Sequence, residues 1–294
     1  MKLAFPIFVL ALFVTPSFAA DYPNKTLLVE PADLAKPDVA KTFMILDARE
    51  KARYEAGHIP GSIWVDHAAW AKAFGDGDHA NAWSKRIGEL GIAVNAKVVV
   101  LDDSTKDAAR IWWILKYWGV ADVRLLNGGW KGWTAAKLEV TKEKSADPRG
   151  VKFNAVSQAE RLATKDYLLK AIDGGKLQIV DARSENEFCG TEKMNNKKAG
   201  AMPGAKQLEW TDLLDAKTQQ FKPANDLKKL FADAGIALDK PSATYCQSGG
   251  RASVMAFGME LMGTKEVRNY YKSWGEWGNA DDTPIVPGKP KEKK

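Results

Sequence analysis

Short apolar runs alternate with amphipathic stretches along most of the chain. Val98 to Leu101 is a continuous apolar run, as expected for a strand in a parallel sheet that is buried on both faces. Downstream, Ile111, Leu115 and Trp118 recur at the spacing of one helix face, and Gly119 stands where a helix would end. Strands that alternate with helices in this order predict an α/β fold with parallel sheets flanked by helices.

The same pattern occurs twice along the chain. An apolar run ends in Asp-Ala-Arg at residues 47–49 and again at residues 181–183, and a Pro-Gly dipeptide follows in each half. From Asp102 and Cys246 onward the halves match at a constant offset, which pairs Gly119 with Gly263, Val123-Arg124 with Val267-Arg268, Trp130 with Trp274 and Trp133 with Trp277. The sequence therefore predicts two tandem domains of one kind, at residues 27–138 and 156–284, joined by a polar linker at residues 139–155.

The two ends of the chain differ from this pattern. Leu3 to Val14 is an apolar run too short to span a bilayer, and Ser17 and Ala19 are the small residues of a signal-peptidase site. Residues 1–19 are therefore predicted to be a signal peptide, with an uncleaved anchor as the alternative. The mature protein is predicted to be periplasmic or secreted. Residues 285–294 are predicted to be a basic, disordered tail.

Composition narrows the classes of partner. The formal net charge is +6, but Lys2 and the lysines of the tail account for most of it. The remaining body is only mildly basic, which argues against the concentrated basic patch of a nucleic-acid-binding surface. We expect no nucleic-acid partner, and no membrane contact once the signal peptide is cleaved. His58, His67 and His79 lack the spacing of metal ligands, so no metal and no cofactor are expected.

The candidate chemistry is concentrated in the hexapeptide Cys246-Gln247-Ser248-Gly249-Gly250-Arg251, called the cysteine loop below. It stands between a β-like run and a helix-like run, so the cysteine ends a strand and faces a helix N-terminus. The partial positive charge there favours the reactive thiolate over the thiol. The glycines let successive N–H groups face one point, which forms a cradle for an anion. Cys246 is therefore the predicted nucleophile, and the predicted cradle consists of Gln247, Ser248, Gly249, Gly250 and Arg251.

The first half has Asp102 where the second half has Cys246, and its matching loop contains no glycine. Because an aspartate cannot attack as a thiolate does, the first half is predicted to be an inactive copy that packs against the second half and walls its pocket. The other cysteine, Cys189, leaves two alternatives open. An exported protein can hold a structural Cys189–Cys246 disulfide, or Cys189 can act as a resolving thiol.

The tandem halves, the Asp-Ala-Arg motifs, the run Gly57-His58-Ile59-Pro60-Gly61-Ser62 and the cysteine loop in the second half alone resemble the rhodanese family of sulfurtransferases. In its tandem form this family includes thiosulfate and 3-mercaptopyruvate sulfurtransferases. The resemblance implies an active site between the halves and a persulfide on Cys246. It also implies a substrate contact for Arg183, with a structural salt bridge as the alternative. A small donor such as thiosulfate would load the cysteine, and cyanide, a thiol or a protein thiol would accept the sulfur.

The residues around the loop leave the donor open. Gln247 and Ser248 are neutral where thiosulfate-type relatives usually have basic residues, and Glu187 stands in place of a second arginine, with a charge that would repel a dianion. Residues 189–200 are an insertion that either shapes the entrance or forms a plain surface loop. Two other functions stay as alternatives, namely a sulfur carrier or redox-binding module without turnover, and a phosphatase, whose cysteine loop would be one residue longer.

Overall fold

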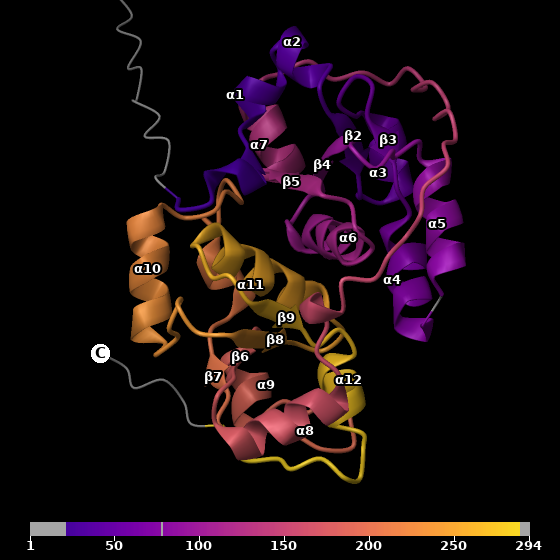
Figure 1. Ribbon diagram of the computed structural model, residues 1–294. Coiled ribbons are helices and arrows are strands. Elements are labelled where there is room, and N and C mark those ends of the chain that lie inside the picture. The colour runs from indigo at the N-terminus through magenta and orange to yellow at the C-terminus, as the bar shows by residue number, and fades with distance from the viewer. Residues whose placement is uncertain (1–21, 78, 289–294) are drawn as a thin grey trace, which may run out of the picture.

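The computed structural model describes residues 22–77 and 79–288. The predicted signal peptide and residues 289–294 of the predicted tail lie outside this part of the chain. Two parallel sheets, each flanked by helices, make up the molecule, with the first half at the top of Figure 1 and the second half below it. This arrangement confirms the α/β class predicted from the alternating pattern.

The first half is built on a five-stranded sheet in which neighbouring strands are parallel. The central strand is buried along Val98–Leu101 because helices cover both faces of the sheet. The spatial order of the strands is β1 (Leu28–Val29), β5 (Asp122–Leu126), β4 (Lys97–Leu101), β2 (Met44–Asp47) and β3 (Ile63–Trp64). The α-helices are α1 (Pro31–Leu34), α2 (Pro37–Ala40), α3 (Lys51–Ala56), α4 (His67–Asp76), α5 (Ala80–Glu89), α6 (Lys106–Tyr117) and α7 (Gly129–Ala135), with a 3-10 turn, η1, at Lys25–Leu27.

The second half repeats this plan on four parallel strands. Their order is β7 (Lys206–Gln207), β6 (Gln178–Asp181), β8 (Ser242–Tyr245) and β9 (Val267–Asn269), which matches β3, β2, β4 and β5 of the first half. The α-helices are α8 (Lys165–Gly174), α9 (Glu185–Cys189), α10 (Ala224–Asp233), α11 (Gly250–Leu261) and α12 (Ser273–Trp277), with 3-10 turns η2 (Ala159–Arg161) and η3 (Trp210–Leu213). The shared strand order shows that the internal repeat in the sequence is a repeat of structure.

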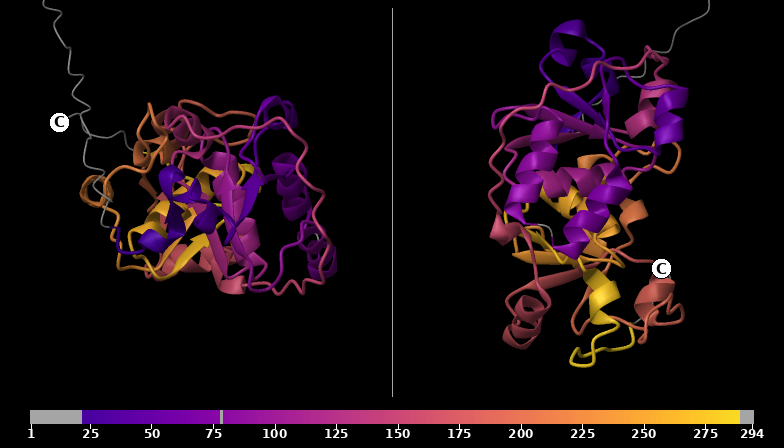
Figure 2. Two further views of the ribbon diagram at one scale, coloured as in Figure 1. Left: turned by 90° about the horizontal axis from the view of Figure 1, so that it is seen from above. Right: turned by 90° about the vertical axis from the view of Figure 1, so that its right-hand side faces the viewer.

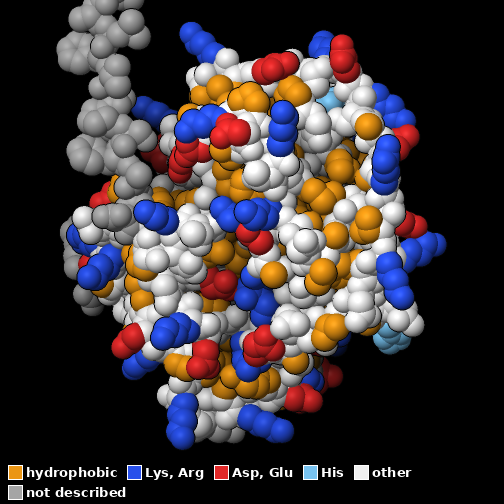
Figure 3. Space-filling model, turned by 45° about the horizontal axis from the view of Figure 1, so that its top comes forward, with side chains coloured by type: hydrophobic (Ala, Val, Ile, Leu, Met, Phe, Trp, Pro, Cys, Tyr) orange, Lys and Arg blue, Asp and Glu red, His pale blue; other side chains and the backbone are white. Residues whose placement is uncertain are grey.

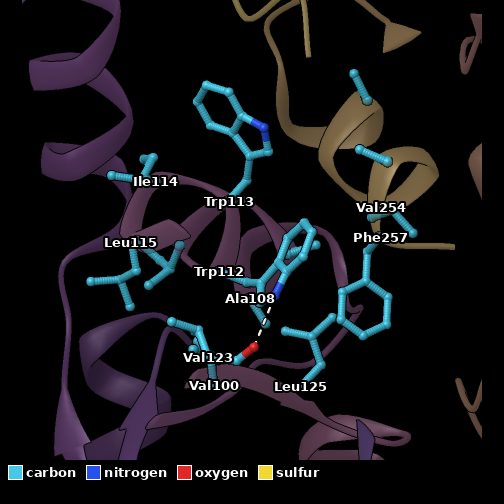
Figure 4. Packing of buried hydrophobic residues seen from close by; sticks show 14 of the residues in the cluster. Val100, Ala108, Trp112, Trp113, Ile114, Leu115, Val123, Leu125, Val254 and Phe257 are labelled. Atoms are coloured by element: carbon cyan, nitrogen blue, oxygen red, sulfur yellow. Dashed lines mark hydrogen bonds between the residues drawn. The ribbon is translucent and has the colours of Figure 1, made fainter. Parts of the chain in front are cut away.

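The halves meet through α6 and α11, the helices that follow the matching strands β4 and β8. Trp112 of α6 and Phe257 of α11 pack edge to face with ring centroids 4.9 Å apart, and Figure 4 shows Val254 beside them. The indole Nε1 of Trp112 donates to the carbonyl of Val123 (3.0 Å), so this buried polar atom is satisfied. One cluster of buried apolar side chains extends over both helices. The relative position of the halves is therefore fixed by core packing.

The linker is attached to the first half over much of its length. His58 and Thr141 exchange both backbone hydrogen bonds (2.9 and 3.0 Å), and Phe153 and Ala155 are buried. Figures 1 and 2 show this segment running down the side of the first half. The start of the predicted tail is also ordered, because Val286 pairs with Ala201 through two backbone hydrogen bonds (2.8 and 3.0 Å). Residues 285–288 therefore belong to the second half, which corrects the predicted start of the tail.

The surface shows no strong segregation of charge on the face in Figure 3, where basic and acidic side chains are interspersed. Within residues 22–77 and 79–288, no helix combines the length and the apolar character that a bilayer crossing requires.

Candidate active site

Cys246 lies directly after β8, an interior strand of the second sheet. Its backbone is fixed on both sides, since its N–H donates to Oγ of Ser273 (3.0 Å) and its carbonyl accepts from the N–H of Trp274 (3.0 Å). The Ser273 hydroxyl donates to the carbonyl of Tyr270 (2.6 Å), and its oxygen lies 4.0 Å from the cysteine Sγ. The Cys246 side chain is almost completely buried, with 1% of the residue exposed. A reagent that reaches this sulfur must therefore be small or must enter from the adjoining cleft.

The cysteine loop turns from the strand into the twelve-residue helix α11. Gly249 has a φ of 83°, in the left-handed region, and α11 starts at the next residue. In the part of the chain that the structure describes, the N–H groups of residues 247–252 have no acceptor. They surround the end of the strand at a helix N-terminus, where both the free donors and the helix dipole favour an anion.

The two glycines of the loop are required for different reasons. A Cβ on Gly249 would lie 2.8 Å from the carbonyl oxygen of Tyr271, in addition to the strain of a positive φ. Gly250 is the first residue of α11, and its φ is not positive. A Cβ there would lie 2.4 Å from Nη2 of Arg110, which enters from the first half. Gly250 is therefore needed for the space it leaves rather than for the curl of the loop, which corrects the reason given by the sequence.

The matching loop of the first half holds a carboxylate in the same cradle. Oδ1 of Asp102 accepts from the N–H groups of Ser104 (3.1 Å) and Thr105 (2.5 Å), and Oδ2 accepts from the N–H of Asp107 (2.8 Å). Thr105 has a φ of 70° at the position of Gly249. Burial raises the pKa of Asp102 to about 6, the charge of Asp107 adds to this, and the N–H donors oppose it. The fold therefore builds an anion-binding loop in both halves, and the first half fills its loop with its own side chain.

The two predicted arginines of the second half are both paired with carboxylates. Arg183 donates to both oxygens of Asp181 (3.0 and 2.7 Å) and to the carbonyl of Gly200 (2.7 Å), and both charged side chains are fully buried. Arg251 donates to both oxygens of Glu187 (2.6 and 2.8 Å). Burial alone would raise the pKa of Glu187, but Arg251 outweighs it and holds this pKa below its usual value. The carboxylate that the sequence placed against an incoming dianion is thus neutralised by its own partner.

Cys189 and the rest of the insertion lie near the cysteine loop but differ in what they contribute to it. Both cysteines are free thiols. Burial and the charge of Glu185 raise the pKa of the Cys189 thiol, which makes it a weaker nucleophile at neutral pH. Within the insertion, Asn196 forms a double amide pair with the side chain of Gln247 (3.0 and 3.1 Å), so the insertion fixes the residue after Cys246. Two of its lysines contact the segment after α12 instead, where Lys198 donates to the carbonyl of Ala280 (2.7 Å) and Lys197 lies 3.9 Å from the carboxylate of Asp281.

The two halves form a cleft of about 780 Å³ that ends on the cysteine loop. The second half contributes Gln247, Ser248 and Tyr271, and the first half contributes His67, Asp107 and Arg110. Sequence reasoning missed Arg110 and Tyr271. The signal for Arg110 was a single charged residue inside an otherwise apolar helical run, Ala108-Ala109-Arg110-Ile111-Trp112. Tyr271 carried no comparable signal.

Comparison with known proteins agrees with this architecture. The family model described as a rhodanese-like domain matches residues 30–136 and 164–280. A thiosulfate sulfurtransferase from Azotobacter vinelandii is 34% identical over 270 residues, which cover 90% of this chain and 98% of that protein. A 3-mercaptopyruvate sulfurtransferase from Mus musculus is 31% identical over 241 residues, covering 79% and 80%. Among solved structures, a persulfide form of an EanB variant with ergothioneine has a TM-score of 0.83 at 25% identity, covering 92% of this chain and 72% of that one.

Proposed function

This chain belongs to the rhodanese family and is a sulfurtransferase that works through a cysteine persulfide, and on that premise we propose that Cys246 carries the sulfur and that thiosulfate, or an anionic donor of the same type, loads it. The Cys246 thiolate attacks the outer sulfur of thiosulfate. A new S–S bond forms, the bond between the two sulfurs of thiosulfate breaks, and its electron pair leaves with sulfite. A thiophilic acceptor then takes the outer sulfur and restores the thiolate, so the two half-reactions follow one another.

The observation that carries this proposal is the filled loop of the first half. Three N–H groups of that loop hold the Asp102 carboxylate, and the corresponding N–H groups of the cysteine loop have no acceptor in the described part of the chain. A persulfide anion on Cys246 would supply the negative charge that the second loop lacks. Fixed donors of this kind stabilise developing charge and are worth about 3 kcal/mol each in other enzymes.

Two observations support an anionic donor of the thiosulfate type. The proteins from Azotobacter vinelandii and Pseudomonas aeruginosa, each 34% identical to this chain, are thiosulfate sulfurtransferases. The local charge balance is also favourable, because Glu187 is paired with Arg251 while Arg110 adds a cation at the cleft. The neutral side chains of Gln247 and Ser248 then add no charge that would oppose the donor.

Intact-mass spectrometry of the purified protein tests this function. After treatment with thiosulfate, we expect the wild-type chain to gain one sulfur atom and to lose it on addition of cyanide or a small thiol. Repeated turnover, measured as thiocyanate formed per enzyme, should accompany this cycle. If the chain gained no sulfur from thiosulfate but gained one atom from 3-mercaptopyruvate, the donor would be 3-mercaptopyruvate and the proposed thiosulfate donor would be wrong.

A sulfur carrier is the second candidate. The sulfur carrier protein TtuD of Thermus thermophilus is 33% identical over 250 residues, covering 80% of this chain. Because Cys246 is buried, a protein partner would have to take the sulfur from the cleft. A carrier would load one sulfur atom as above but would show no steady turnover with cyanide or small thiols, and would release its sulfur to a protein thiol.

We also propose that the protein is exported through the signal peptide at residues 1–19. The support is the apolar run followed by Ser17 and Ala19 in the sequence. Tyr22 is already part of the fold, since its hydroxyl donates to the carbonyls of Phe221 (3.0 Å) and Lys222 (2.9 Å), so cleavage after Ala19 would leave the folded part intact. N-terminal sequencing of the protein from the periplasm or medium should begin at Ala20, whereas an intact N-terminus in the cytosol would refute export.

A further inference from the structure

Three arginines lie around the cysteine loop, and Arg110 differs from the other two. Arg183 and Arg251 are each bound by a carboxylate through two hydrogen bonds. No carboxylate oxygen of the described residues lies within 4 Å of the Arg110 guanidinium. The lysines of the cleft, Lys72 and Lys272, pair with Asp76 and Glu276 respectively. Arg110 is therefore the cation of this cleft that no carboxylate of the described residues binds directly.

The Arg110 side chain belongs to one half but makes its contacts in the other. It extends from α6, is only 9% exposed, and its Nη1 donates to the carbonyl of Ser248 (2.7 Å) and to the hydroxyl of Tyr271 (3.0 Å). Its Nε is buried without a partner. Burial opposes its charge, but Tyr271, Cys246 and the Asp107 carboxylate together favour it more strongly, and the pKa of Arg110 is raised. A buried guanidinium that is held by a carbonyl and a hydroxyl, without a carboxylate in contact, is an energetically costly arrangement.

The hydrogen bond to Ser248 fixes the direction of a cradle donor. The peptide between Ser248 and Gly249 is trans, so its carbonyl and its N–H point in opposite directions. Holding the carbonyl oxygen on Arg110 turns the N–H of Gly249 the other way. In the first half, the N–H at this position belongs to Thr105 and donates to the Asp102 carboxylate. Arg110 therefore directs the corresponding N–H of the cysteine loop into the cradle.

We propose that Arg110, supplied by the half that lacks the cysteine, is the positioning residue of the persulfide site: it fixes the Ser248–Gly249 peptide and provides a positive charge, bound directly by no carboxylate, that attracts an anionic sulfur donor. This role rests on the function proposed above. With this role of Arg110, the first half contributes to the reaction itself and does not only line the cleft. It also explains why Gly250 has no side chain, since a Cβ would displace the Arg110 guanidinium.

Single-turnover loading of Cys246, followed by intact mass, tests the proposal with two small donors of different charge. Thiosulfate carries two negative charges and methanethiosulfonate carries one, and each delivers its outer sulfur to the thiolate and leaves as sulfite or methanesulfinate. We expect Arg110→Met to slow loading by thiosulfate about 10²-fold, as the loss of an oriented donor does elsewhere. The loss for methanethiosulfonate should be about tenfold smaller, because one less charge interacts with the missing cation.

The conservative variant separates charge from geometry. Arg110→Lys keeps the charge, so the ratio of the two loading rates should stay near the wild-type ratio, while both rates fall because lysine lacks the planar fork. Arg161→Met is the matched control, since Arg161 pairs with Glu260 of its own half (2.6 Å) and its guanidinium lies over the Trp112 ring of the first half (5.3 Å to the centroid), but it lies outside the cleft. That variant should lower the melting temperature without changing the ratio of rates.

The outcomes distinguish this role from the proposed function itself. A folded Arg110→Met protein that is loaded by both donors at the wild-type rates would overturn the positioning role. If Arg110→Met lowered both loading rates by the same factor, the role of the Arg110 charge would be overturned, and only its effect on the geometry of the loop would remain. If Arg110→Met does not fold, Arg110→Gln, which keeps a donor for the Ser248 carbonyl, takes its place in the same measurement. Failure of the wild-type chain to load would instead refute the function of Cys246.

Discussion

Replacing Cys246 by serine is expected to abolish sulfur transfer and to leave the protein folded. Serine is nearly the same size, and its hydroxyl can accept hydrogen bonds from the free N–H groups of residues 247–252, so core packing is preserved. A serine hydroxyl is not ionised at neutral pH and has no polarisable sulfur, so it cannot hold a transferable sulfur atom. We expect turnover to fall by about 10³-fold or more, to the uncatalysed background, in an assay of thiocyanate formation.

Cys189→Ser is the matched control for this variant. Cys189 ends α9, carries a raised pKa and forms no disulfide with Cys246, so its removal should leave loading and turnover at the wild-type level. Intact mass after thiosulfate treatment should show one added sulfur atom in Cys189→Ser and none in Cys246→Ser. The reverse pattern would move the nucleophile to Cys189, and loss of turnover in both variants would point to a resolving role for Cys189.

Asp181→Asn is expected to cause the largest loss of stability. Asp181 and Arg183 are both buried, and the guanidinium also lies over the Trp274 ring, 4.2 Å from its centroid. Asparagine keeps the shape but leaves the cation without a counter-charge inside the second half. Removing one partner of a buried ion pair typically costs about 3–5 kcal/mol, because the remaining charge stays buried. Urea denaturation should show a loss of this size in the free energy of unfolding.

The first half offers a matched comparison. Asp47 and Arg49 form the same buried pair at the end of β2, with a separation of 2.6 Å, and the Arg49 guanidinium lies over Trp130. Asp47→Asn should therefore destabilise the protein by a similar amount. A loss below about 1 kcal/mol in Asp181→Asn alone would mean that Arg183 does not depend on its carboxylate. The alternative of a direct substrate contact for Arg183 would then gain support.

The sequence predicted those features whose signals are local or repeated. The apolar run before Asp102 and the helical spacing of Ile111 and Leu115 each depend on a few neighbouring residues, and the match of Gly119 with Gly263 is part of the repeat. These signals led to two parallel sheets flanked by helices, and to one cysteine loop between a strand and a helix. The predicted start of the tail was wrong because the pairing of Val286 with Ala201 joins residues that are far apart in the sequence. The composition of the tail does not indicate such a pairing.

By itself, the sequence therefore determined the duplicated α/β scaffold and the single loop that differs chemically from its copy. Only the tertiary structure decided how the charges around that loop are distributed. The packing of α6 on α11 brings Arg110 to Ser248, and the position of α9 lets Glu187 neutralise Arg251. Each of these pairs joins residues that are more than sixty positions apart. The physical reason is that hydrophobic patterning specifies which face of a helix is buried, whereas the charges that meet around the loop depend on how finished helices and domains pack together.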